Sequence, residues 1–145
     1  MEMRRGRAAA AGLSSVSTAE RREPAARRRL SAPALRAFFN ITRAWQLGVD
    51  EERGLLGWPP PSTFHKYKSG DAGVLGFDAL TRISLVLGIY KALHILLPTN
   101  EMADAWVKKP NTAQGFGGKS ALDKMLAGRV IDLADVRRYL DAQRG

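Results

Sequence analysis

From residue 31 onward, apolar side chains recur along the chain at steps of three and four residues. This spacing links Leu35, Phe38, Phe39, Thr42 and Trp45, and it places them on one face of an α-helix. No pair of alternating apolar segments flanked by turn residues competes with this pattern, so the sequence predicts an all-α fold. Helices are expected at residues 33–47, 49–56, 63–69, 77–87 and 90–97, then between Pro98 and Pro110, at 121–127 and from Asp132 onward.

The sharpest break in this pattern is the segment WPPP at residues 58–61. Proline lacks a backbone N–H and restricts the residue before it, so the segment cannot continue a helix. It separates two short helices, which is typical of a helix-turn-helix whose second helix enters the major groove of DNA. An ordinary helical hairpin with a solvated basic face is the alternative.

Helical spacing assigns a role to each side chain of the second helix. Phe64 and Tyr67 are three residues apart and are expected to face inward. Thr and His side chains can reach base edges, whereas lysines suit phosphates. The predicted DNA-binding residues are Ser62, which is also expected to cap the helix, Thr63, His65, Lys66 and Lys68.

The positive charge is concentrated at the N-terminus. Residues 1–30 hold eight arginines against three glutamates, whereas residues 31–90 carry a net charge of +1 and residues 91–145 of +3, out of +9 for the chain. With no aromatic residue, residues 1–30 are expected to form a disordered basic arm, because they bury too little apolar surface to offset the entropy of ordering. Such an arm either adds non-specific affinity for phosphates or is a solvated tail, an overextended start or an organellar transit peptide.

Other features exclude several classes of protein. The chain has no cysteine and two histidines, which argues against disulfides, metal centres and thiol catalysis. Its longest apolar run, near residues 93–97, is far shorter than the about 20 residues of a spanning helix, so no membrane association is expected. The segment 113–120, AQGFGGKS, matches a relaxed phosphate-binding loop, but the charged, proline-broken residues before it cannot form the strand that such a loop follows. A connecting loop is expected there, and no cofactor, metal or catalytic residue is predicted.

Four segments of the C-terminal half resemble, in order, the Xre/MbcA/ParS family of antitoxins. They are residues 87–98 (LGIYKALHILLP), 105–111 (AWVKKPN), 116–128 (FGGKSALDKMLAG) and 136–145 (VRRYLDAQRG). As an ordered series these segments are specific, and the resemblance extends over about residues 31–145.

The resemblance implies an Xre-like helix-turn-helix DNA-binding region at residues 31–97 and a small helical toxin-binding domain at residues 98–145. Family members of this kind pair with RES-domain toxins, which consume NAD⁺, and neutralise them by bringing the C-terminal helix to the active-site cleft. They also tend to repress their own operon. The toxin-binding residues that the resemblance implies are Arg137, Arg138, Asp141, Arg144 and Gly145.

We therefore expect a non-enzymatic antitoxin of a type II toxin–antitoxin system in the bacterial cytoplasm, with a RES-domain toxin and operator DNA as partners. A homodimer is expected because helix-turn-helix proteins usually read paired half-sites. The alternative is a stand-alone helix-turn-helix transcriptional regulator, and a nucleotide-binding enzyme rests only on AQGFGGKS. Trp106 and Phe116 are expected in the core, because aromatic side chains of so small a lobe are more often core than interface.

Overall fold

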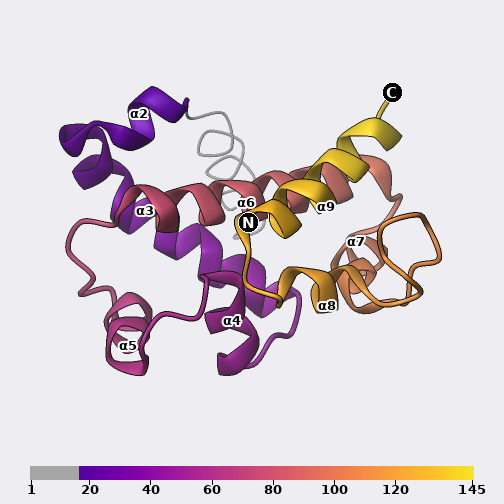
Figure 1. Ribbon diagram of the computed structural model, residues 1–145, viewed down its shortest axis with the longest axis horizontal. Helices are drawn as coiled ribbons and strands as arrows, with labels where there is room; N and C mark the ends of the chain where they lie inside the picture. Colours follow the sequence, from indigo (N-terminus) through magenta and orange to yellow (C-terminus); the bar gives the residue numbers. More distant parts are fainter. Residues whose placement is uncertain (1–16) are drawn as a thin grey trace.

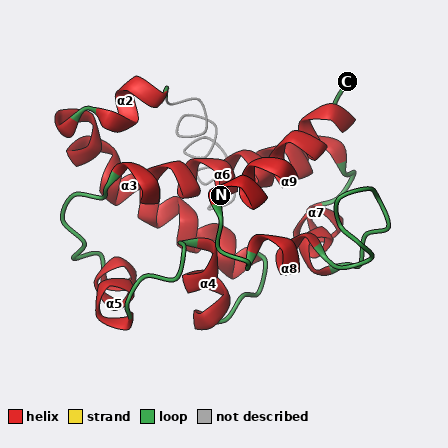
Figure 2. Cartoon of the chain, viewed as in Figure 1, coloured by secondary structure: helices red, strands yellow, loops and turns green. Residues whose placement is uncertain are grey.

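The chain forms a set of helices joined by short loops. The computed structural model describes residues 17–145, and every named element in that stretch is an α-helix or a 3₁₀ turn, which confirms the predicted all-α class (Figures 1 and 2). The elements are α2 (Thr18–Arg22), α3 (Pro24–Ala44), α4 (Val49–Leu55), α5 (Pro61–Ser69), α6 (Phe77–Leu96), α7 (Asn100–Ala105), the 3₁₀ turn η1 (Trp106–Lys108), α8 (Ala121–Met125) and α9 (Val130–Gln143).

The long helix α6 is the centre of the fold, with α3 and α9 packed against it (Figure 1). By length and composition alone α6 would suffice to span a membrane, so the expectation that no apolar segment reaches that length is wrong. In this structure 61% of the most apolar 18-residue stretch of α6 is buried inside the protein. A helix that is apolar on all sides is typical of a buried core helix, and the packing of α6 accounts for its composition.

The two halves of the chain share one hydrophobic core. Phe38 and Phe64 from the first half lie in the same buried cluster as Met125 and Leu140 from the second. Polar contacts also cross between the halves: the side chain of Lys108 donates to the carbonyl of Gln46 at 2.7 Å, and that of Arg82 donates to the carbonyl of Gly128, also at 2.7 Å. The boundary predicted near Pro98 therefore separates two regions of the sequence, but both regions pack around the same core.

The predicted disordered arm is wrong for residues 18–30, which form α2 and the start of α3 on either side of Glu23. Residues 1–16 of that arm lie outside the described residues. The helix α3 begins at Pro24, nine residues before the predicted start, and buries Ala26 and Ala34. The hydroxyl of Ser31 accepts a hydrogen bond from the backbone N–H of Leu75 at 2.8 Å. Small buried side chains and this bond dock the segment, although its composition shows few large apolar residues.

Other helix boundaries differ from the predictions in instructive ways. The N-cap of α5 is Pro60 rather than Ser62, because Pro61 occupies the first position of the helix, where the fixed φ of proline is favourable. The last helix begins at Val130, two residues before the predicted start at Asp132. The carboxylate of Asp132 is buried and pairs with Arg129 at 2.9 Å. Gly88 does not interrupt α6.

Candidate functional site

The predicted DNA-reading helix α5 is held against α3 by aromatic packing. Phe64 is 1% exposed, and its ring meets that of Phe39 on α3 edge-on, with 6.0 Å between the ring centres. Tyr67, almost one turn further along α5, is half-buried. The prediction that Phe64 and Tyr67 face inward is confirmed, so the opposite side of α5 faces solvent.

A buried carboxylate ties α3, α4 and α5 together. Glu52 on α4 is 3% exposed and accepts hydrogen bonds from the hydroxyl of Thr42 on α3 at 2.6 Å and from the ammonium of Lys68 on α5 at 2.5 Å. The same ammonium lies 4.9 Å from the centre of the Phe39 ring. A buried carboxylate requires such partners, so Lys68 has a structural role that the sequence analysis missed, and its contact with phosphate stays a prediction.

The free side of α5 carries the other side chains predicted to contact DNA. Ser62, His65 and Lys66 are exposed and Thr63 is partly exposed. Among residues 17–145, no carboxylate lies within ion-pair distance of Lys66. These four side chains thus share one accessible surface, where Thr63 and His65 suit base edges and Lys66 suits a phosphate. Their individual roles stay predictions.

Trp58 fixes the turn between α4 and α5. Its backbone has a φ of 61°, a left-handed conformation that bulky residues rarely adopt. Its indole lies against Gly128, where an added Cβ would be 2.8 Å from a ring carbon, and its Nε1 donates to the carbonyl of Leu126 at 3.2 Å. The turn therefore rests on the connection between α8 and α9, in the other half of the chain.

The residues predicted to meet a toxin lie together on the last turns of α9. The arginine–aspartate contacts along this helix are Arg137–Asp141 at 3.6 Å, Arg144–Asp141 at 3.6 Å and Arg138–Asp135 at 3.3 Å. Gly145 follows the helix and is exposed. The end of α9 thus presents both signs of charge, and the contact of these residues with a partner stays a prediction.

Gly88 brings α9 close to α6. An added Cβ at this position would lie 2.5 Å from the guanidinium carbon of Arg137. Gly88, which lies between the helices expected at residues 77–87 and 90–97, therefore makes room for the side chain of Arg137 on the neighbouring helix.

Tyr139 of α9 packs with Trp106 of η1 and with Phe116 of the loop before α8. Phe116 is buried, and Trp106 and Tyr139 are half-buried, with 5.1 Å between the ring centres of Phe116 and Tyr139. The expectation that Phe116 belongs to the core is confirmed, whereas Trp106 is partly buried and packs against that core. The AQGFGGKS segment is the connecting loop that inserts Phe116, and its Ser120 accepts a hydrogen bond from the backbone of Asp123 as the cap of α8.

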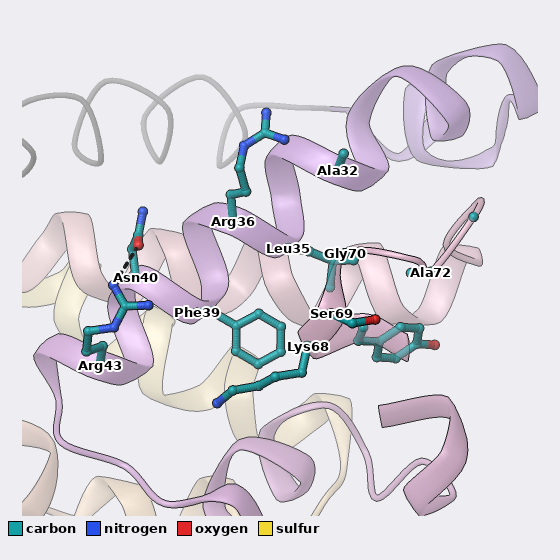
Figure 3. A pocket seen from close by; sticks show the side chains of 12 residues that line it. Ala32, Leu35, Arg36, Phe39, Asn40, Arg43, Lys68, Ser69, Gly70 and Ala72 are labelled. Carbon is teal, nitrogen blue, oxygen red and sulfur yellow. Dashed lines mark hydrogen bonds between the residues drawn. The ribbon is translucent and has the colours of Figure 1, made fainter. Parts of the chain in front are cut away.

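An open cavity of about 400 Å³ lies between α3 and α5, and sequence reasoning missed it (Figure 3). Phe39 and Tyr67 line its apolar side, and Arg36 and Arg43 contribute its positive charge. Lys68 also lines the cavity, but its ammonium is paired with Glu52. Burial, and to a lesser extent the carboxylate of Asp78, raise the pKa of Tyr67 above its usual range, so the phenol stays neutral. The seven-residue spacing of Arg36 and Arg43 in the sequence indicates that both lie on one face of α3.

Two family models match the chain. One, described as the antitoxin Xre-like helix-turn-helix domain, matches residues 24–88. The other, described as the antitoxin Xre/MbcA/ParS C-terminal toxin-binding domain, matches residues 92–145. An uncharacterized protein of Sinorhizobium fredii, y4oB, is 50% identical over 111 residues, which are 77% of this chain and 84% of that protein. The chain belongs to the Xre/MbcA/ParS antitoxin family.

The antitoxin thus combines a helix-turn-helix domain with a toxin-binding domain, and the matches extend the first of these toward the N-terminus. Residues 24–88 include Arg27, Arg28 and Arg29, and they hold nine basic side chains against five acidic ones, a net charge of +4. Residues 31–90 carry only +1 because these three arginines precede residue 31. No solved structure matches the antitoxin significantly.

Proposed function

We propose that the antitoxin neutralises a RES-domain toxin, an enzyme that consumes NAD⁺, by laying α9 over the entrance to the active site of the toxin. The observation that carries this proposal is the free end of α9, which is exposed from Asp141 to Gly145 and leads away from the body of the protein (Figure 1). The C-terminal domain supports a toxin as partner, and the choice of a RES-domain toxin rests on the family resemblance.

The charges of α9 suit such a cleft. A site that binds the pyrophosphate of NAD⁺ carries positive charge, which attracts the carboxylates of Asp135 and Asp141. The arginines paired with them along α9 are then free to approach acidic or polar catalytic groups of the toxin. Exposed ion pairs contribute little to folding, so α9 can exchange its internal partners for those of the toxin at small cost.

Co-purification of the antitoxin with the product of an adjacent gene, and identification of that product as a RES-domain protein, tests this proposal. We expect a stable complex, and loss of cellular NAD⁺ when the toxin is expressed alone. Reversing a charge on α9, by Arg138→Glu or Asp141→Lys, should weaken inhibition by about tenfold or more, because like charges across an interface are costly. The matched control is Arg36→Glu on α3, which should inhibit as the natural chain does.

Two results would contradict the proposal in different ways. Full NAD⁺ consumption by a toxin to which the antitoxin remains tightly bound would exclude the blocking mechanism. The absence of any complex, with operator binding intact, would favour a stand-alone transcriptional regulator.

We propose further that the antitoxin represses its own operon as a homodimer through α5, in the bacterial cytoplasm and with no enzymatic activity of its own. The exposed side of α5 supports this proposal. Lys66→Ala should weaken binding to every duplex and lower the salt slope by about 1, whereas His65→Ala should relax preference at one base position. Unchanged operator affinity in both variants would remove α5 from the interface.

A further inference from the structure

The helix α3 carries an unusual set of charges. Its 21 residues include five arginines and no aspartate or glutamate. Within residues 17–145, none of these arginines forms an ion pair, whereas every arginine of α9 and its N-cap pairs with an aspartate. The aspartates of α9 therefore offset the charge of its arginines, whereas the arginines of α3 have no carboxylate partner among the described residues.

Three of these arginines form one line along the helix. Arg29, Arg36 and Arg43 are separated by seven residues each and are exposed, and a heptad returns to the same face of a helix within about 20°. At a rise of about 1.5 Å per residue, successive members are about 10 Å apart. Exposed Ala32 and Asn40 lie between them. We call Arg29, Arg36 and Arg43 the arginine stripe.

The arginine stripe adjoins the DNA-reading helix. Arg36 and Arg43 line the same cavity as Lys68 and Ser69 of α5, and Figure 3 shows the two arginines along α3 with Lys68 across from them, beyond Phe39. The other neighbour of α5 has the opposite charge, because the first turn of α4 holds Asp50, whose side chain is 87% exposed, and Glu51. A polyanion bound to α5 is therefore attracted toward α3 and repelled from the start of α4.

We propose that the arginine stripe holds the sugar–phosphate backbone of duplex DNA that extends beyond α5. This inference rests on the proposed binding of operator DNA by α5. Regularly spaced arginines that form no ion pair with residues 17–145 suit a ladder of phosphates, and Arg is well matched to phosphate geometry. An anionic membrane is the weaker partner, because the exposed positions between the arginines are Ala32 and Asn40 and offer no large apolar side chain for insertion.

The test compares binding of the full chain to two duplexes of equal length, one from its own promoter and one of random sequence, over a range of salt concentrations. The double substitution of Arg36 and Arg43 by Gln should lower the salt slope by about 2, since each phosphate contact contributes about 0.9. It should weaken both duplexes several-fold and by similar factors. The matched control is the double substitution of Lys109 and Lys119 by Gln, which removes two exposed cations from the other half of the chain and should leave both duplexes unaffected.

The outcomes separate this inference from the proposal on α5. A normal salt slope in the double variant, together with a lowered slope in Lys66→Ala, would show that α5 binds DNA and that the arginine stripe does not. Failure of the natural chain to bind either duplex overturns both. Arginine-dependent binding to phosphatidylserine vesicles, without arginine-dependent binding to DNA, assigns the stripe to a membrane and overturns the inference. Circular dichroism of each variant verifies that α3 is intact.

Discussion

At the scale of single residues, Glu52 decides how the helix-turn-helix holds together. Its carboxylate is buried between three helices and takes its hydrogen bonds from Thr42 and Lys68. Removing a charge from water is costly, and the partners offset that cost only while both are in place. The position of α5 therefore depends on a polar contact as well as on the packing of Phe64.

Substitution of Glu52 or Lys68 tests this dependence. Glu52→Gln should lower the free energy of unfolding by about 1–3 kcal/mol, because the amide retains a bond to Thr42 but loses the charge that attracts Lys68. Lys68→Met should also destabilise the protein, whereas Lys66→Met, on the free side of α5, should stay within about 0.5 kcal/mol. Urea denaturation measures all three, and equal effects of the two lysine substitutions would contradict a structural role for Lys68.

The sequence predicted some side-chain positions in α5 and not others. Phe64 and Tyr67 face inward as their spacing requires, because an apolar pair three residues apart has one favourable side on an amphipathic helix. The same helical spacing predicts that Lys68 contacts phosphate, which stays a prediction, but it did not reveal the ion pair of Lys68 with a carboxylate 16 residues earlier in the chain. Local periodicity identifies a buried face and cannot identify a tertiary ion pair.

At the scale of elements, α3 shows where composition misleads. A helix start was expected at Pro33, since proline is favourable in a first turn, yet the helix runs through it from Pro24. The N-terminal half of α3 buries alanines and the hydroxyl of Ser31 rather than large apolar residues. Sequence reasoning recognised the large apolar stripe after residue 34 and had no signal for the small one before it.

Ser31→Ala tests whether this half of α3 is docked. The buried N–H of Leu75 would lose its acceptor, which costs about 1–3 kcal/mol. Ser69→Ala is the matched control, because the hydroxyl of Ser69 is exposed and donates within its own helix, so its removal should cost less than about 0.5 kcal/mol. Chemical denaturation gives both values, and a loss at Ser31 as small as that at Ser69 would argue for an undocked N-terminal half.

The contact between Trp58 and Gly128 gives a second test at this scale. Gly128 has a φ of +87° and would bring an added Cβ to 2.8 Å from the indole, whereas Gly118 has a φ of +79° and open space around it. Gly118→Ala should cost about 1–2 kcal/mol through backbone strain alone. Gly128→Ala should cost about 1–3 kcal/mol more because of overpacking. Thermal unfolding compares the two, and similar losses would show that the indole yields freely.

At the scale of the whole molecule, the order of the two domains was predictable from motifs, but the core that they share was not. The C-terminal segments identified the toxin-binding domain, and WPPP marked the helix-turn-helix turn. Nothing in the spacing of residues shows that α6 serves both domains, or that Lys108 and Arg82 bond across them. These contacts join positions tens of residues apart, where a single sequence carries no pairing information.

A cavity made in the core at α9 should therefore destabilise the other helices as well. Leu140 is 2% exposed, and Leu140→Ala should cost about 2–5 kcal/mol. Because the core is continuous, amide hydrogen exchange should become faster in α3, α4 and α5 as well as in α9. Gln143→Ala, an exposed change on the same helix, should leave exchange unaltered. Faster exchange confined to α7–α9 would show that the two halves open independently.

The indole of Trp58 gives this arrangement a thermodynamic consequence. It stands between the turn that precedes α5 and the loop from which α9 departs, so a toxin that moved α9 as a whole would also move the support of the helix proposed to bind DNA. Linkage then requires reciprocity: whatever factor toxin occupancy applies to operator affinity, operator occupancy applies to toxin affinity. Titration of toxin and operator in the two orders would then yield the same coupling constant.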